Sequence, residues 1–227
     1  MNKLIFVEGP KGVGKTHIMS KINTGDRHPF EAYEITREPW NNEMRYMASD
    51  ELHTAGRDHL IPDPTTQSMM YTADRRLHMQ YVQEWLEWHS VICDRGPLST
   101  MVYQGLVGGV DLDWLLSLNR VAMENVEVAA TILLHAPFET TVQRIEERGT
   151  PLTPQERDQL RPAWEAYESL RLGAHDPNGY PWRIRIQQMM AKWKSITGWI
   201  YYIDANRPAA EMEADVIATI DRIIQGA

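Results

Sequence analysis

One stretch near the N-terminus constrains the fold of this chain more than any other. Residues 9–16 read Gly-Pro-Lys-Gly-Val-Gly-Lys-Thr, preceded by the apolar segment LIFVE and followed by the helix-compatible segment THIMSKI. Glycines at these positions let the backbone curl so that successive N–H groups point at phosphate oxygens, and the start of a helix adds its positive dipole end. A glycine-rich loop of this pattern, between a strand and a helix, is the phosphate-binding motif called a P-loop. Nucleotide phosphates are therefore the expected ligand.

The last two residues of this loop have the most specific expected tasks. Lys15 would supply a mobile positive charge for the β- and γ-phosphates, and the Thr16 hydroxyl is a predicted ligand of Mg²⁺. A P-loop does not by itself reveal the reaction, because ATPases, GTPases, kinases and switches all carry one. The loop residues that we predict to bind ATP are Gly9, Lys11, Gly12, Val13, Gly14, Lys15 and Thr16.

Five short apolar segments, rich in β-branched or aromatic residues, alternate with longer helical stretches. Most of the segments are continuously apolar, as expected of strands that are covered on both faces. The alternation predicts an α/β fold of the P-loop NTPase type, with a five-stranded parallel sheet flanked by helices in a single domain over residues 1–227. The predicted strands cover residues 4–7, 32–35, 91–93, 131–134 and 199–203, and the clearest helices cover residues 65–88 and 212–224.

Two regions interrupt this alternation. Residues 41–64 are polar and end in two closely spaced prolines, so we expect a short helix followed by a loop. The residues GAHDPNG at 173–179 predict a turn, and the segment PWRIRIQ after them is expected to form an edge strand or an arm. Neither region has the composition of a linker between domains.

Composition narrows the setting in which the chain works. A single cysteine, Cys93, excludes an intrachain disulfide and suits a reducing cytoplasm, and the N-terminus lacks the features of a signal peptide. The sequence contains no run of about 18 apolar residues, so no membrane span is expected. The formal net charge of −8 argues against broad binding to polymeric nucleic acid, although a local basic pocket for phosphates remains compatible with it.

A second group of chemically suggestive residues follows the predicted strands. The strand SVIC ends in Asp94-Arg95. A carboxylate at this place can bind Mg²⁺ or interact with the attacking oxygen, and a guanidinium can bind a second phosphate. Arg37 follows the second strand and is expected at the same edge of the sheet. Tyr71 and Arg75 are spaced i,i+4 and share a helix face, an arrangement that suits stacking and hydrogen bonding to a nucleobase.

These blocks together resemble the thymidylate kinase (dTMP kinase) family of P-loop nucleoside monophosphate kinases. The resemblance runs nearly end to end, through FVEGPKGVGKT, ITREP, YTADRRLH, VICDRGPLSTMVYQG, the RIEERG region and the C-terminal YYIDANRP. It implies ATP-dependent phosphorylation of a deoxynucleoside monophosphate, with dTMP converted to dTDP. It also implies a Mg²⁺ cofactor, a cytoplasmic enzyme of nucleotide biosynthesis and a homodimer.

The resemblance assigns roles to individual residues. Arg37 and Arg95 would grip the acceptor phosphate, and Asp94 would assist Mg²⁺ and the acceptor oxygen. Tyr71 would stack on the base while Arg75 contacts a base oxygen. The remaining acceptor residues that it implies are Ser99, Thr100 near the base edge and Tyr103 against the deoxyribose. Asn206 in the C-terminal block is implied near the ATP adenine.

A mobile lid with arginines over the phosphates is also implied, and it corresponds to residues 144–161. The candidate arginines are Arg144, Arg148, Arg157 and Arg161, of which we select Arg148 and Arg157 as catalytic. Some relatives carry a catalytic arginine in the P-loop at the position of Gly12, so in this chain the charge is expected from the lid.

The sequence departs from the family pattern at several places near the acceptor pocket. Lys11 stands where the family has an acidic residue that touches the sugar 3′-hydroxyl, which reverses the charge and the hydrogen-bond sense. Gly96 stands where the family commonly has an aromatic residue, and Trp-Asn-Asn at residues 40–42 stands where the family normally has two glycines after the TREP block. Residues 173–195 form an apparent insertion. These changes leave open a kinase of the same fold for another or base-modified nucleotide. More distant alternatives are a kinase of bases in polymeric DNA and a nucleotide-dependent switch without transfer activity.

Overall fold

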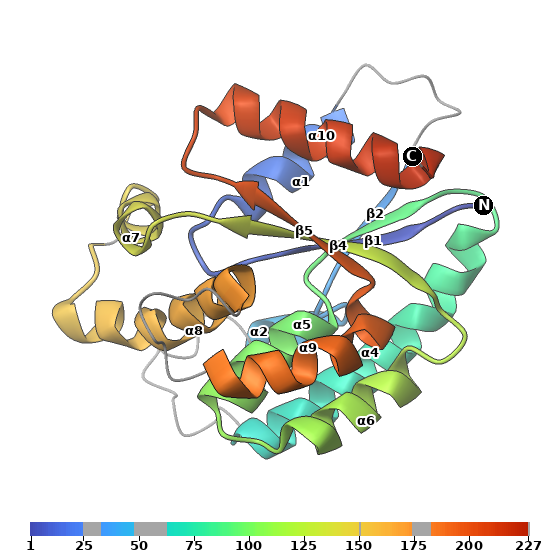
Figure 1. Cartoon of the computed structure of the whole chain (residues 1–227), viewed down its shortest axis with the longest axis horizontal. Coiled ribbons are helices and arrows are strands. Elements are labelled where there is room, and N and C mark those ends of the chain that lie inside the picture. The colour runs from blue at the N-terminus through green and yellow to red at the C-terminus, as the bar shows by residue number, and fades with distance from the viewer. Residues whose placement is uncertain (25–32, 48–62, 150, 174–182, 227) are drawn as a thin grey trace.

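The computed structural model describes residues 1–24, 33–47, 63–149, 151–173 and 183–226. Its five strands form one parallel sheet in the order β2-β3-β1-β4-β5 (Figure 1). The strands are β1 (Leu4–Glu8), β2 (Glu34–Arg37), β3 (Val91–Asp94), β4 (Val128–His135) and β5 (Trp199–Asp204). The predicted five-stranded α/β fold is confirmed. Of the predicted second strand, residue 32 lies outside the described residues.

Helices cover both faces of the sheet. In Figure 1, α1 and α10 lie on one face, while α4, α5, α6 and α9 lie on the other. The helices of the described residues are α1 (Lys15–Thr24), α2 (Asn42–Met47), α4 (Pro64–Leu86), α5 (Pro97–Thr100), the π-helical η3 (Met101–Val107), α6 (Leu112–Ala122), α7 (Phe138–Glu146), α8 (Pro154–Leu172), α9 (Arg183–Thr197) and α10 (Ala209–Gln225). No described helix is long and apolar enough to cross a membrane.

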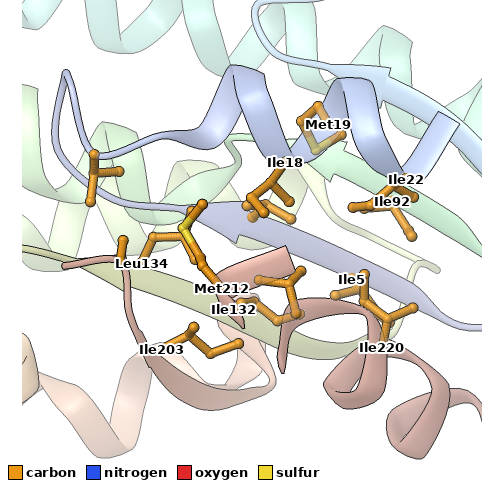
Figure 2. Close-up of a cluster of buried hydrophobic side chains, with 14 of the residues drawn as sticks. Ile5, Ile18, Met19, Ile22, Ile92, Ile132, Leu134, Ile203, Met212 and Ile220 are labelled. Atoms are coloured by element: carbon orange, nitrogen blue, oxygen red, sulfur yellow. The ribbon is translucent and has the colours of Figure 1, made fainter. Parts of the chain in front are cut away.

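The core is divided by the sheet. Figure 2 shows the layer beneath α1 and α10, where Ile18 of α1 and Ile220 of α10 meet Ile5 and Ile132 of the strands, all almost completely buried. The opposite layer is centred on Trp193, Leu115 and neighbouring apolar residues. Burial of each large apolar side chain contributes about 1.5–3 kcal/mol. Sheet and helices are thereby held rigidly enough to present polar residues at one sheet edge.

The prediction of an edge strand or arm over 181–187 is wrong for residues 183–187, and residues 181 and 182 lie outside the described residues. Helix α9 begins at Arg183 and continues to Thr197. Ile186, Met189, Trp193 and Ile196 recur at three- and four-residue intervals and are at most 6% exposed, because they pack on α5, α6 and α8. This is the period of a helix with one buried face. The predicted short helix in 41–64 is α2, and residues 48–62 of the predicted loop, like residues 174–179 of the predicted turn, lie outside the described residues.

Candidate active site

A cavity of about 740 Å³ opens at the carboxyl ends of β1, β2 and β3. In parallel α/β sheets this edge is where ligands bind, because the loops that follow the strands diverge there. The register places Arg37 of β2 opposite Asp94 of β3, and Val7 of β1 opposite the same aspartate. The residues that line the cavity are Pro10, Lys11, Arg37, Glu38, Pro39, Gln67, Tyr71, Asp74, Arg75, Asp94, Arg95, Gly96, Ser99, Thr100, Tyr103, Gln104, Phe138, Thr141, Gln159, Leu160, Ala163 and Trp164.

The loop between β1 and α1 has the backbone of a phosphate-binding loop. Gly9, Gly12 and Gly14 have φ angles of 142°, 83° and 116°. A side chain at Gly12 would be excluded twice, since its Cβ would lie 2.3 Å from the Thr141 carbonyl oxygen in addition to the strained φ. No arginine fits at this position, and the expectation that the lid supplies the catalytic charge stays a prediction.

Lys15 occupies the first turn of α1 and is almost fully buried. Its Nζ donates to the carbonyl oxygens of Gly9 at 2.6 Å and Pro10 at 2.9 Å. Burial, followed by the positive charge of Arg95, lowers the pKa of Lys15 from 10.5 to about 7. The ammonium therefore lies in an environment that has too little negative charge, which ATP phosphates would supply.

The residues predicted to hold Mg²⁺ suit that ion. The Asp94 Oδ1 atom is buried and has no hydrogen-bond partner among the described residues, although Asp94 lines the cavity. Thr16 follows Lys15 in the first turn of α1 and is exposed. The described residues contain no cluster of three or more carboxylate, His or Cys ligands. One carboxylate and one hydroxyl fit a Mg²⁺ ion that takes its other ligands from nucleotide phosphates and water.

Two arginines on neighbouring strand ends form the second anion-binding feature of the cavity. Arg37 is exposed into it, and Arg95 takes a left-handed backbone conformation with a φ of 69°. The Arg95 guanidinium donates to Ser99 Oγ at 3.0 Å and lies 5.5 Å from the centre of the Tyr103 ring. The structure therefore brings together Arg37, Arg95, Ser99 and Tyr103, which sequence patterns alone had associated.

Tyr71 and Arg75 also line this cavity, on α4. Burial, the dominant effect, raises the pKa of the Tyr71 hydroxyl, so the ring enters the cavity as a neutral aromatic. Arg75 is only 3% exposed, and its guanidinium donates to Glu38, Thr100 and Asn119. Glu38 and Asn119 were not predicted, since a carboxylate and an amide in separate segments carry no recognisable spacing.

Glu8 is another residue that the sequence analysis missed. It is the last residue of β1 and is fully buried. Its carboxylate accepts hydrogen bonds from the backbone N–H groups of Gly96 at 2.8 Å and Ser99 at 2.9 Å, from Ser99 Oγ at 2.8 Å and from the Tyr167 hydroxyl at 3.0 Å. Glu8 thus ties the P-loop strand, the turn that carries Arg95 and helix α8 together. A carboxylate at the end of an apolar strand was the available signal.

The arginines of the predicted lid occupy different environments. Arg148 is exposed, and its charge contributes to lowering the pKa of Lys15, while Arg157 forms an ion pair with Glu146 at 2.6 Å. Arg144 donates to the carbonyl oxygens of Val13 and Ala205, and Arg161 lies 4.0 Å from the centre of the Phe138 ring. Neither Arg148 nor Arg157 lines the cavity, so their catalytic roles stay predictions.

The C-terminal block spans the second half of β5 and the turn after it, and this turn lies near the P-loop. Arg144 joins Val13 of the P-loop to Ala205, with distances of 3.0 and 2.8 Å. Asn206 is exposed beside this junction and accepts a hydrogen bond from Thr140 Oγ1 at 2.9 Å. Asn206 therefore lies on the same side of the P-loop as Arg144, and its place beside the nucleotide stays a prediction.

Comparison with known proteins identifies the family to which the chain belongs. The model of the thymidylate kinase family matches residues 7–171, well over half of the chain. The chain belongs to the thymidylate kinase family. The thymidylate kinase of Shouchella clausii is 29% identical over 226 residues, which cover 97% of this chain and 95% of that protein. The thymidylate kinase of Limosilactobacillus fermentum is 32% identical over 151 residues, covering 63% of this chain and 68% of its own.

A solved structure supports the architecture of this thymidylate kinase family member. The crystal structure of thymidylate kinase from Ehrlichia chaffeensis superposes with a TM-score of 0.61 at 18% sequence identity, covering 96% of this chain and 98% of that one. At this identity the similarity establishes the fold. The family assignment rests on the sequence match over the P-loop, the strand-end arginines and most of α8.

Proposed function

We propose that this kinase transfers the γ-phosphoryl group of ATP to dTMP and forms dTDP. The observation that carries the proposal is the meeting of two anion-binding groups at one sheet edge. The P-loop with Lys15 supplies the first, and Arg37 and Arg95 on the neighbouring strand ends supply the second. A switch that only binds and hydrolyses a nucleotide has no need of the second group.

The chain's own residues account for the requirements of phosphoryl transfer, which are mainly positioning and charge neutralisation. The P-loop amides and Lys15 hold the donor phosphates, while Arg37 and Arg95 hold the acceptor phosphate. Mg²⁺, held by Thr16 and Asp94, would neutralise charge on the donor phosphates. Arg148 and Arg157 would close over the transferring group as parts of a lid at residues 144–161, and closure would exclude water.

The base end of the cavity supports a pyrimidine acceptor. Tyr71 and Tyr103 offer aromatic faces, and Thr100 and Arg75 offer hydrogen-bonding groups. We assign the stacking surface to Tyr71 and the contact with a base oxygen to Arg75. Tyr103, which lies beside Arg95, would pack against the deoxyribose.

One observation favours a second candidate acceptor. Lys11 lines the same cavity as Arg37, Arg75 and Arg95, so the described lining carries four cationic side chains. Lys11 stands where the family has an acidic residue, and this reversal of charge would favour a nucleotide with an altered sugar or a modified base. This second candidate retains the fold and the chemistry and differs only in the acceptor.

A panel of acceptors distinguishes these functions. ADP release is followed with ATP and each of dTMP, dUMP, dCMP, dGMP, ribonucleoside monophosphates and 5-hydroxymethyl-dUMP, with duplex DNA as a further arm. The proposal expects dTMP to give the highest kcat/KM, and Lys15→Ala to abolish turnover while the circular dichroism spectrum is unchanged. A better substrate elsewhere in the panel would replace dTMP, and slow ATP hydrolysis that no acceptor stimulates would replace the kinase with a switch.

The organisation of the whole molecule is part of the proposal. We treat residues 1–227 as a single kinase domain that works in the cytoplasm as a homodimer. Helix α4 leaves Met69, Leu77 and Tyr81 well exposed along its outer side, and apolar side chains of this size are typical of subunit contacts. Sedimentation velocity on the full chain tests the dimer, and a monomer at micromolar concentration would contradict it.

A further inference from the structure

The guanidinium of Arg75 is fixed from several sides by residues of different segments. Its Nε and Nη2 atoms donate to Glu38 Oε2 at 2.8 and 2.5 Å, and Nη2 also donates to Thr100 Oγ1 at 3.2 Å. Nη1 donates to Asn119 Oδ1. A guanidinium has five N–H donors, so these contacts use four of them. The fifth is on Nη1 and has no hydrogen-bond partner among the residues that the structure describes. The Arg75 side chain lines the cavity.

The groups that fix Arg75 are themselves immobilised. Asn119, on α6, is fully buried, and its Nδ2 donates to the Leu115 carbonyl oxygen at 2.8 Å, which leaves Oδ1 directed at Arg75. Glu38 is 7% exposed, and His78 Nδ1 lies 3.5 Å from its second carboxylate oxygen. Burial is the largest single effect and would raise the pKa of the Glu38 carboxyl, but the charge and hydrogen bonds of Arg75 together with His78 outweigh burial and lower it. The carboxylate is thus ionised beside the guanidinium.

Holding a long side chain in one rotamer restricts what it can recognise. An arginine with free donors on both terminal nitrogens can turn to satisfy different partners, since its side chain has several rotatable bonds. When Glu38 and Asn119 accept from opposite edges, the orientation of the remaining N–H is set before a ligand arrives. A fixed donor favours a carbonyl oxygen on the ligand and opposes an amino group, because the amino group would leave buried donors facing each other.

We propose that Asn119 is a positioning residue that, with Glu38, orients Arg75 so that the acceptor site selects a base with a carbonyl over one with an amino group at the same place. The inference rests on the proposed function for the identity of the acceptor. It extends that function to a residue that does not line the cavity. Thymine carries a carbonyl at position 4, where cytosine carries an amino group, so dTMP and dCMP form the natural pair of probes.

The test measures binding without ATP, so that it stays separate from turnover. Isothermal titration gives the ratio of the Kd for dCMP to the Kd for dTMP in the full-length protein. Asn119→Leu keeps the number of side-chain heavy atoms and the branch at Cγ but removes the acceptor. We expect the ratio to fall about tenfold, because an unpaired buried donor can then turn toward another partner. Asn119→Asp retains an acceptor oxygen and is expected to keep most of the preference for dTMP.

A matched control separates orientation from general stability. Thr131 on β4 is 1% exposed, and its Oγ1 donates to the Thr197 carbonyl oxygen at 2.7 Å in the core. Thr131→Val should lower the thermal unfolding temperature and leave the Kd ratio unchanged. If Asn119→Leu fails to fold, Asn119→Ser serves in its place, since a helical serine hydroxyl bonds its own helix and does not reach Arg75.

The outcomes are distinct. A folded Asn119→Leu or Asn119→Ser variant with the wild-type ratio would overturn the inference, as would an equal fall in Thr131→Val. Equal binding of dTMP and dCMP by the wild type would also overturn it, even if the protein phosphorylates dTMP. A wild type that prefers dTMP but transfers no phosphate would instead contradict the proposed function and leave the role of Asn119 supported.

Discussion

Replacing Glu8 tests how the acceptor turn is held against the P-loop strand. The Glu8 Oε1 atom accepts from the N–H groups of Gly96 and Ser99, and Oε2 accepts from Ser99 Oγ and the Tyr167 hydroxyl. Leucine at this position would fill the space but offer no acceptor. The two hydroxyls lie 3.2 Å apart and can pair with each other, so the cost falls on the two backbone N–H groups.

The magnitude follows from that count. A buried donor without an acceptor costs about 1–3 kcal/mol, so two of them predict a loss of about 2–6 kcal/mol in the free energy of unfolding for Glu8→Leu. Glu8→Gln keeps one oxygen for both N–H groups and presents its amide to the hydroxyls, which can rotate to accept. We therefore expect Glu8→Gln to lose about 1 kcal/mol, as a typical single hydrogen bond is worth.

Urea denaturation followed by tryptophan fluorescence measures both variants, with the free energy obtained by linear extrapolation. The difference in the free energy of unfolding between Glu8→Leu and Glu8→Gln measures the cost of leaving the two backbone N–H groups unpaired. Because the same turn carries Arg95, a folded Glu8→Leu protein should also show a raised KM for the acceptor and a smaller change in ATP affinity. Equal unfolding free energies for the two variants would refute the assignment of Glu8 as the acceptor for this turn.

Three further predictions concern the donor side. Lys15 has a pKa of about 7 in the free protein, and ATP phosphates should raise it. ATP binding should therefore take up close to one proton at a pH about one unit above that pKa, and almost none about one unit below it. Calorimetric titration in buffers of different ionisation enthalpy would detect this uptake. Proton release at the higher pH would contradict the predicted sign. Gly12→Ala should cost at least about 2 kcal/mol of stability because of the positive φ and the Thr141 carbonyl, with much weaker ATP binding in a calorimetric titration; unchanged affinity would contradict the close approach. Arg148→Ala or Arg157→Ala should lower kcat by about 10³-fold or more while ATP still binds, and turnover that survives both changes would show that the lid assignment is wrong.

Much of the fold could be predicted from short stretches of sequence. The P-loop is encoded locally, because glycines permit its positive φ angles and an apolar strand and a helix bound it. The five strands were recognisable from continuous apolar runs, and Arg37 and Arg95 from their places after two of them. Parallel strands end at a common edge, so this linear pattern was enough to predict that the two arginines share a site.

Other features depended on contacts that no short stretch contains. The segment from Arg183 forms a helix because a rigid layer of α5, α6 and α8 receives Trp193 and its neighbours, whereas the seven residues used for the prediction are compatible with either element. Glu38 and Asn119 pair with Arg75, and Glu8 pairs with Tyr167. These partners lie 37, 44 and 159 positions away in the chain. A buried polar group is stable only where folding brings a complementary group to it, and that requirement fixes no spacing in the sequence. The sequence alone therefore determined the loop, the strands and the charges at their ends, while the tertiary structure decided which buried groups hold those charges in place.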